Sequence, residues 1–198
     1  MPEIHPVLTG EKVILARVRP EDVPVMARHF ANLELTAYLG AIGGAFSLED
    51  EQAYFESISK SKPDGVTFGI YTREGQTYIG GVDLRTINHR HGTAELGVSI
   101  HDPEYWGGGY GSEAVRLMVE YGMYFLGLHN IQLNVFSYNT RGIRAYEKVG
   151  FREIGRRRGA IRLGGERFDA VLMDITADEV DMSRMRGLVR LLPATLEE

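Results

Sequence analysis

The chain has 198 residues, of which 43% are apolar and 25% charged, so it is long enough to bury a substantial core within one domain. Its 22 basic and 27 acidic residues give a formal charge of −5, which argues against a general nucleic-acid-binding protein. The lack of cysteine excludes disulfides and a cysteine nucleophile, and no stretch approaches the roughly 20 apolar residues of a membrane span.

Six elements are predicted before residue 101. Pro20 and the two acids after it are typical of a first helical turn, and Ser47 followed by Asp50 is typical of a helix cap. The segment Arg73–Gln76 predicts the turn of a hairpin. The expected strands are Lys12–Val18, Val66–Thr72, Thr77–Thr86 and Thr93–Ile100, and the expected helices are Pro20–Asn32 and Ser47–Lys60.

A glycine run between a strand and a helix, from Tyr105 to Glu113, is the most informative feature of the chain. Four of the five residues at positions 107–111 are glycine, so a bulky phosphate can approach the backbone closely. The unpaired N–H groups of a helix start and the positive end of its dipole together form an anion site. Taken alone, the run is equally consistent with a flexible turn.

The second half of the chain predicts helix Glu113–Leu126, strand Ile131–Ser137, helix Thr140–Val149, and a hairpin of strands Phe151–Leu163 and Glu166–Thr176. This order predicts one α/β domain over residues 1–177, with a mixed sheet whose strands before and after the glycine run are parallel. Residues 178–198 are expected to form a helical tail that packs on the domain or on a dimer partner. Arg156–Arg158 is expected at a solvated strand edge.

A second motif, Asn139–Phe151, follows the next strand. With the glycine run it resembles the GNAT acetyltransferase superfamily, which moves an acetyl group from acetyl-CoA to an amine. Gly109 and Gly111 match the glycines of that family's pyrophosphate signature, whereas Trp106 stands where arginine or glutamine is usual. The run, with the segments 8–13 and 94–97, is most similar to the branch that contains the ribosomal-protein N-terminal acetyltransferases.

The resemblance implies a GNAT-like fold: a mixed, mostly antiparallel sheet of six to seven strands, with a splayed parallel central pair and about four flanking helices. The opened strand edge at Val98, Ser99 and Ile100 would pair with the pantetheine amides of CoA as another strand does. Asn139 would contact the pantetheine arm, cap the following helix, or do both. The pyrophosphate would be bound, without any lysine, by the backbone amides of Gly107, Gly108, Gly109, Tyr110, Gly111 and Ser112.

Two residues are candidates for the chemistry. Tyr146 falls where many GNAT enzymes carry a tyrosine beside the CoA sulfur, and it would donate a proton to the departing thiolate. Packing in the core is its alternative role. Glu95 is the candidate base, since strand alternation places it on one face with Gly97 and Ser99. A solvated strand glutamate is the alternative interpretation.

These features predict an acetyl-CoA-dependent N-acetyltransferase that acts on a primary amine by direct transfer in a ternary complex, without a metal. The alternative is a non-catalytic acyl-CoA-binding regulatory module. By the same resemblance, residues 33–47 and 159–165 should border the acceptor, but they carry no code for a protein N-terminus, a polyamine, an antibiotic or an amino acid. We expect a cytoplasmic protein without membrane or general nucleic-acid binding, as a monomer or a homodimer.

Overall fold

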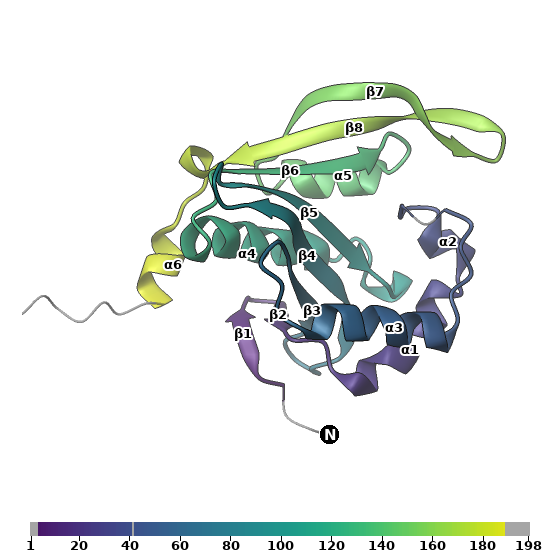
Figure 1. Ribbon diagram of the computed structural model, residues 1–198, viewed down its shortest axis with the longest axis horizontal. Helices are drawn as coiled ribbons and strands as arrows, with labels where there is room; N and C mark the ends of the chain where they lie inside the picture. The colour runs from purple at the N-terminus through teal and green to yellow at the C-terminus, as the bar shows by residue number, and fades with distance from the viewer. Residues whose placement is uncertain (1–3, 41, 189–198) are drawn as a thin grey trace, which may run out of the picture.

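The computed structural model describes residues 4–40 and 42–188 of the chain. They form one eight-stranded sheet in the order β1-β2-β3-β4-β5-β6-β8-β7 with helices around it (Figure 1). The strands are β1 (Pro6–Thr9), β2 (Val13–Ala16), β3 (Val66–Thr72), β4 (Tyr78–Asn88), β5 (Thr93–Ile100), β6 (Asn130–Phe136), β7 (Arg152–Leu163) and β8 (Glu166–Thr176). The α-helices are α1 (Val23–Phe30), α2 (Leu33–Thr36), α3 (Leu48–Ser59), α4 (Tyr110–Phe125), α5 (Thr140–Glu147) and α6 (Ser183–Leu188).

The sheet is mostly antiparallel, and its one parallel pair within the described residues is β5 with β6. This mixed arrangement confirms the predicted fold class. Two details differ from the expectation: the described residues contain an eighth strand, β1, and six α-helices instead of about four. Strand β1 has four residues and begins at Pro6, and so short a segment with a proline gives little strand signal.

Strands β5 and β6 pair only at their beginnings. Residues Thr93–Glu95 lie opposite Asn130–Gln132, and no parallel pairing continues beyond Glu95 in the described ladder. Strand β6 nevertheless remains paired with β8 as far as Phe136. The edge of β5 from Leu96 to Ile100 is therefore open toward β6, which is the divergence of the central pair expected from the sequence.

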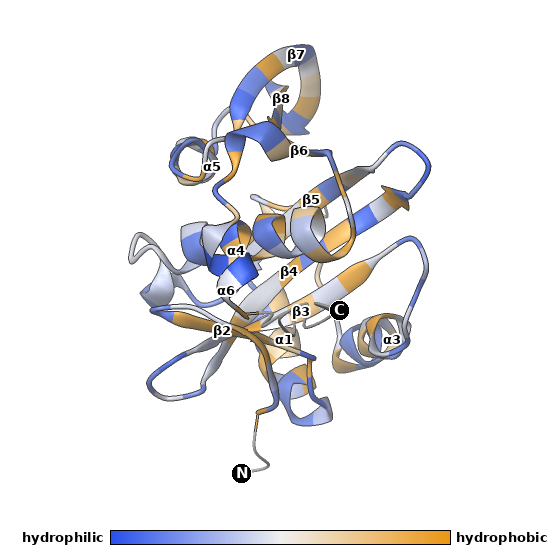
Figure 2. Cartoon of the chain, turned by 90° about the vertical axis from the view of Figure 1, so that its left-hand side faces the viewer, coloured by the Kyte–Doolittle hydropathy of each residue, from blue (hydrophilic) through white to orange (hydrophobic). Residues whose placement is uncertain are grey.

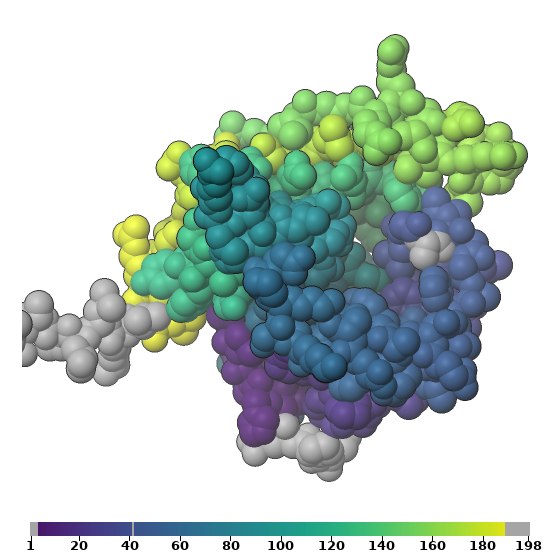
Figure 3. Space-filling view, in the orientation of Figure 1, coloured from purple at the N-terminus to yellow at the C-terminus, as the bar shows by residue number. Residues whose placement is uncertain are grey.

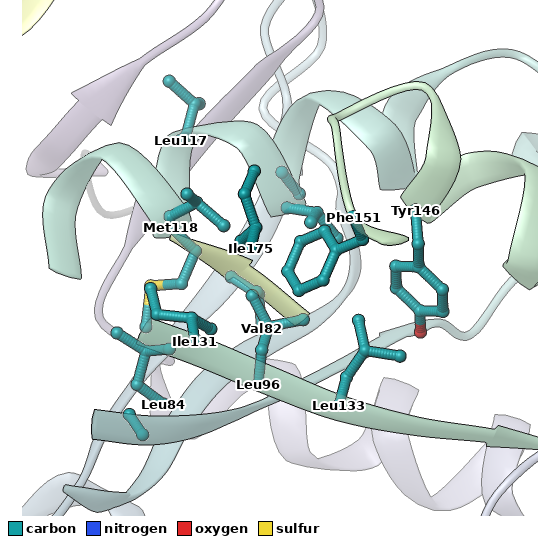
Figure 4. Packing of buried hydrophobic residues seen from close by; sticks show 14 of the residues in the cluster. Val82, Leu84, Leu96, Leu117, Met118, Ile131, Leu133, Tyr146, Phe151 and Ile175 are labelled. Atoms are coloured by element: carbon teal, nitrogen blue, oxygen red, sulfur yellow. The ribbon is translucent and has the colours of Figure 1, made fainter. Parts of the chain in front are cut away.

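Helix α4 covers one face of the sheet and forms the main core with it. Its buried stripe of Ala114, Leu117 and Met118 packs with side chains from β4, β5, β6 and β8 (Figure 4). A smaller cluster on the opposite face joins Met26 of α1 to Tyr71 and other residues of β2, β3 and β4. Figure 2 shows the apolar stretches of β2–β4 between α4 and the pair α1 and α3. The sheet thus presents two covered faces.

Helix α4 begins one turn earlier than predicted, at Tyr110 instead of Glu113. Gly109 caps it in the left-handed region, with φ of 86°, and its carbonyl accepts the first helical hydrogen bond from Glu113 N–H at 3.0 Å. The sequence did not predict this first turn of the helix, because glycine is a weak helix former. Tyr110, Gly111 and Ser112 are therefore the first helical turn, whose N–H groups lack intrahelical partners.

Helix α6 lies at the start of the predicted tail and packs on the domain. Met185 is fully buried in the main core, and Arg184 Nη1 lies 3.5 Å from Glu120 Oε2 on α4. Residues 189–198 of that predicted tail lie outside the described residues. The helices of the described part are all too short or too polar to cross a bilayer.

Arg156–Arg158 lies on β7, the last strand in the sheet order, and is exposed there, as predicted.

Candidate active site

A cavity of about 750 Å³ lies between the α4 start, strands β4 and β5, helix α5, and the helices α1–α3. In Figure 3 the molecule is hollowed between the blue N-terminal helices and the green segments above them. The structure brings most of the predicted site residues together on its wall. These are Glu95, Val98, Ser99, Ile100, Gly107, Gly109, Gly111, Ser112, Asn139 and Tyr146.

Gly108 and Tyr110 were also predicted to bind the cofactor, but neither lines this cavity. The Tyr110 ring instead packs edge-on against Tyr105, with ring centroids 5.4 Å apart. The Gly108 carbonyl accepts a hydrogen bond from Lys12 Nζ at 2.8 Å. The run itself contains no lysine, but Lys12 reaches it from 96 residues away in the sequence. The binding of a pyrophosphate by the backbone amides of the run stays a prediction.

The glycines of the run have different physical roles. Gly107 and Gly109 have φ of 76° and 86°, a region that L side chains rarely adopt, so they shape the turn. Gly111 does not have a positive φ, and a Cβ there would meet Ile100 Cγ1 at an ordinary 3.5 Å. Gly111 therefore keeps the cavity open at the helix start instead of relieving backbone strain.

Arg141 brings a cation to the place where Trp106 replaces the arginine or glutamine of the family signature. Trp106 Nε1 donates a hydrogen bond to the Ile100 carbonyl at 2.8 Å, which fixes the ring. The Arg141 guanidinium carbon lies 3.7 Å from a Trp106 ring centroid and 5.3 Å from that of Tyr38. All three residues line the cavity. The sequence analysis missed Arg141, although it lies within the second motif.

Asn139 caps helix α5. Its Oδ1 accepts a hydrogen bond from Gly142 N–H at 2.9 Å, which satisfies one of the free donors of the helix start. The capping role weighed in the sequence analysis is thus confirmed. Since Asn139 also lines the cavity, the cap and a contact with a bound molecule are compatible.

Tyr146 lies between the core and the cavity. It is 9% exposed, and its ring packs against Phe151 with centroids 6.0 Å apart. Figure 4 shows it at the margin of the apolar cluster. Burial raises the pKa of its hydroxyl to about 12, with Arg85 opposing and Asp83 reinforcing that shift. Tyr146 therefore has a packing role and also lies within the field of the charged side chains of β4.

Those charged side chains form a cluster in which one arginine joins two carboxylates. Arg85 lies directly opposite Glu95 in the β4–β5 ladder. Its Nη2 is 2.6 Å from Glu95 Oε1, and its Nη1 is 3.1 Å from Asp83 Oδ1. All three residues line the cavity. The predicted base, Glu95, is thus ion-paired, and a second carboxylate lies beside it.

The sequence analysis did not single out Asp83. It lies opposite Gly97 in the ladder, and a Cβ at Gly97 would come within 2.6 Å of Asp83 Oδ2. Gly97 therefore provides the space that the carboxyl group occupies. Burial raises the pKa of Asp83, while Arg85 opposes the rise. The alternation of Asp83 and Arg85 along β4 was the signal available in the sequence.

Part of the cavity wall comes from one of the two segments that were predicted to border the acceptor. Leu35, Tyr38, Leu39 and Gly40, all within residues 33–47, line the cavity. Residues 159–165 do not, because they lie at the far end of the β7–β8 hairpin, beyond β6 in the sheet. The other side chains of this wall come from α1 and α3, namely Phe30, Tyr54 and Ile58.

Comparison with known protein families agrees with this geometry. The sequence model of the acetyltransferase (GNAT) domain matches residues 12–152. The chain belongs to the GNAT family. The matched residues include the glycine run, the charged cluster and Tyr146, so this GNAT protein carries its cavity within the family domain.

Relatives of this GNAT protein cover most of its length. The uncharacterized N-acetyltransferase YoaA of Bacillus subtilis is 28% identical over 174 residues, 87% of this chain and 97% of that protein. The spermidine N-acetyltransferase from Vibrio cholerae in complex with CoA and spermine has a TM-score of 0.75 at 22% identity, covering 86% and 98% of the two chains. Mycobacterium smegmatis RimJ in complex with CoA-disulfide has a TM-score of 0.75 at 21% identity, covering 85% and 83%. The predicted family and fold are confirmed, and the protein is an acyltransferase.

Proposed function

We propose that this GNAT protein transfers an acetyl group from acetyl-CoA directly to a primary amine, within a ternary complex. One observation carries the proposal: the glycine run, the open edge of β5 and the Asp83–Arg85–Glu95 cluster all lie on one cavity. A donor site and a site for a cationic acceptor are then contiguous. Holding two reactants in this way can supply effective molarities of about 10⁵–10⁸ M.

The donor side has the features that CoA requires. The first turn of α4 offers unpaired N–H groups to a pyrophosphate, and Lys12 and Arg141 add positive charge near the run. The open β5 edge from Leu96 to Ile100 offers backbone groups to the amides of pantetheine. Acetyl-CoA would supply the acyl group in an activated form, as a thioester.

The acceptor side has the features that an ammonium group requires. Asp83 and Glu95 attract the cation and take its proton, because an amine attacks only in its neutral form. Burial raises the pKa of Asp83, so its carboxylate is a stronger base than that of a solvent-exposed aspartate. In the overall reaction a C–N bond forms, the thioester C–S bond breaks, and the amine proton leaves through this cluster.

Tyr146 is the residue that we propose to interact with the departing sulfur of CoA. A thiol has an ordinary pKa of about 8.5, well below the value of about 12 for Tyr146, so complete proton transfer from the phenol to the thiolate is uphill. The hydroxyl therefore acts by donating a hydrogen bond to the developing negative charge. Its burial favours this role, because hydrogen bonds to charge are stronger away from water.

An acceptor-panel assay tests the proposal. Acetyl-CoA is incubated with the protein and a set of primary amines, and thiol release is measured together with the mass of the acetylated product. The expected result is amine-dependent release, abolished when Asp83 and Glu95 are replaced together by Asn and Gln. Tight acetyl-CoA binding in calorimetry without turnover of any amine would favour the regulatory-module alternative.

A further inference from the structure

Three cations form a row on helix α5 along the wall of the cavity. They are Arg141, Arg144 and Lys148, and all three line the cavity. Residues three and four positions apart on a helix are neighbours on one face, so these side chains follow one another along α5 and its C-cap. Seven residues of helix span about 10 Å, which is the length of the row.

The row has no partner of opposite charge in the described part of the chain. None of its three side chains has a hydrogen bond or an ion pair with another described residue. The Arg141 guanidinium stacks on Trp106, and Arg144 and Lys148 are exposed. Like charges at this spacing repel each other, and Arg141 lies in the first turn of α5, where the helix dipole disfavours a cation. An anion bound beside the row would reduce this repulsion.

The charges of the cavity are separated into two regions. On β4 and β5, one guanidinium is ion-paired with the two carboxylates Asp83 and Glu95, which leaves one negative charge. The α5 row carries three positive charges. These six side chains are the Asp, Glu, Lys and Arg residues among the described residues that line the cavity. The cluster on the strands therefore attracts an ammonium group, while the row on α5 attracts an anion.

CoA carries more negative charge than its pyrophosphate alone. Its ribose holds the pyrophosphate on the 5′ oxygen and a phosphate monoester on the 3′ oxygen. The N–H groups in the first turn of α4 suit the pyrophosphate, and Arg141 stacks on Trp106 directly before the glycine run. Arg144 and Lys148 lie about one and two turns further along α5, so they are available for a second phosphate on the same ribose.

We propose that Arg144 and Lys148 bind the 3′-phosphate of CoA, and that the enzyme thereby selects CoA and acetyl-CoA against their 3′-dephospho forms. The guanidinium of Arg144 can donate two parallel hydrogen bonds to phosphate oxygens, and the Lys148 ammonium adds a point charge. A phosphate monoester carries a charge of about −1.5 to −2 near pH 7, which matches these two cations. This inference rests on the proposed function, because it requires CoA in the cavity.

Calorimetric titration of the full chain with CoA and with dephospho-CoA tests the inference. We expect the wild-type protein to bind CoA about 10-fold more tightly, the effect of one charge-assisted hydrogen bond. Replacing Arg144 and Lys148 together by glutamine should weaken CoA binding, leave the Kd of dephospho-CoA nearly unchanged, and bring the ratio toward 1. Arg90→Gln is the matched control, since Arg90 is exposed in the turn after β4 and lies outside the cavity, so it should keep the ratio.

Initial rates with acetyl-CoA give a second readout. The double variant should raise the KM of acetyl-CoA and keep kcat, because the phosphate is remote from the reacting atoms. Equal Kd values for the two ligands in the wild type, or a ratio that the double variant does not change, would overturn the inference and leave the proposed function intact. A rise in the KM of the amine alone would also overturn it, by assigning the row to an acidic acceptor. If neither ligand binds, the proposed function fails as well.

Discussion

Glu113 and Lys12 share a hydrogen bond beside the glycine run, and Lys12 also contacts the run itself. Glu113 Oε2 accepts a hydrogen bond from the Lys12 backbone N–H at 2.7 Å, and the Lys12 side chain donates to the carbonyl of Gly108. The same carboxylate also accepts the N–H groups of Glu11 and Val13, at 2.7 and 2.9 Å. The turn between β1 and β2 therefore fixes the first turn of α4 from outside the helix.

Replacing Glu113 with glutamine should destabilise the protein by about 3 kcal/mol, because a neutral amide cannot accept all three N–H groups and presents two donors of its own. Urea denaturation measures the change. Glu56→Gln, an exposed helical glutamate on α3, is the matched control and should change stability by less than about 0.5 kcal/mol. A loss in Glu113→Gln no larger than in the control would contradict this structural role.

Gly111→Val should weaken CoA binding by at least about 10-fold, because the side chain enters the cavity at the α4 start, where the anion site lies. Its backbone φ is not positive, so folding should be retained. Gly109→Val provides the contrast, since its φ of 86° makes that variant unfold more easily. Calorimetric titration with CoA, after a thermal melt of each variant, separates the two effects. Unchanged affinity in a folded Gly111→Val protein would refute the anion site.

Tyr146→Phe should lower kcat by about 10²-fold, the lower end of the range for removing one hydrogen-bond donor from a developing negative charge, with little change in CoA affinity. The ring contact with Phe151 is retained and only the hydroxyl is removed. Stopped-flow thiol release and calorimetry provide the two measurements. Wild-type turnover in this variant would leave Tyr146 with a packing role alone.

Asp83→Asn and Glu95→Gln should each lower kcat most strongly below the pKa of the amine and recover in part at alkaline pH, where the amine is already neutral. We expect the larger effect at Asp83, whose pKa is raised by burial. Because both carboxylates share Arg85, the two losses should not add, and a double-mutant cycle over a pH series measures the coupling. A mutant-to-wild-type ratio that is flat with pH would show that neither group is the base.

Much of the fold follows from local patterns, and the remainder depends on contacts between distant residues. The helix stripe of Leu117 and Met118, the Ser47 cap and the β7–β8 hairpin were predictable because each lies within one short segment. The start of α4 was not, because its first turn depends on backbone groups about 100 residues earlier that bind Glu113.

The residues of the site also fall into two groups: those that a local motif predicts and those that depend on contacts between distant segments. The glycine run and Tyr146 belong to motifs with fixed spacing, so the sequence indicates them. Asp83 and Lys12 lie in ordinary strand and turn segments, and only the strand register and the packing of the β1–β2 turn bring them to the cavity and the run. His101 follows a strand, and nothing in its neighbours predicts that its ring is buried.

His101 should also make the protein sensitive to acid. Its folded pKa of about 3 lies below the ordinary 6.5, so the unfolded chain binds more protons between these values and stability falls as pH falls through that window. Between pH 7 and 5 the loss should be about 2 kcal/mol, and His29, whose pKa is also lowered by burial, adds to it. His101→Asn should reduce this loss, whereas His91→Gln, an exposed control, should not. Urea midpoints at both pH values provide the measurement.

Among the described residues, strand β7 ends the sheet, and its outer edge leaves a row of backbone groups without a neighbouring strand. Such an edge is a template on which another copy of the chain can add a strand and begin an aggregate. Five of the twelve residues of β7 are arginines, and its ladder with β8 is interrupted at Glu153/Gly155 and at Arg157/Ile161. Two such edges brought together would repel electrostatically and fail to match in register. The arginines and the irregular register of β7 therefore disfavour the addition of a strand from another copy of the chain at this edge.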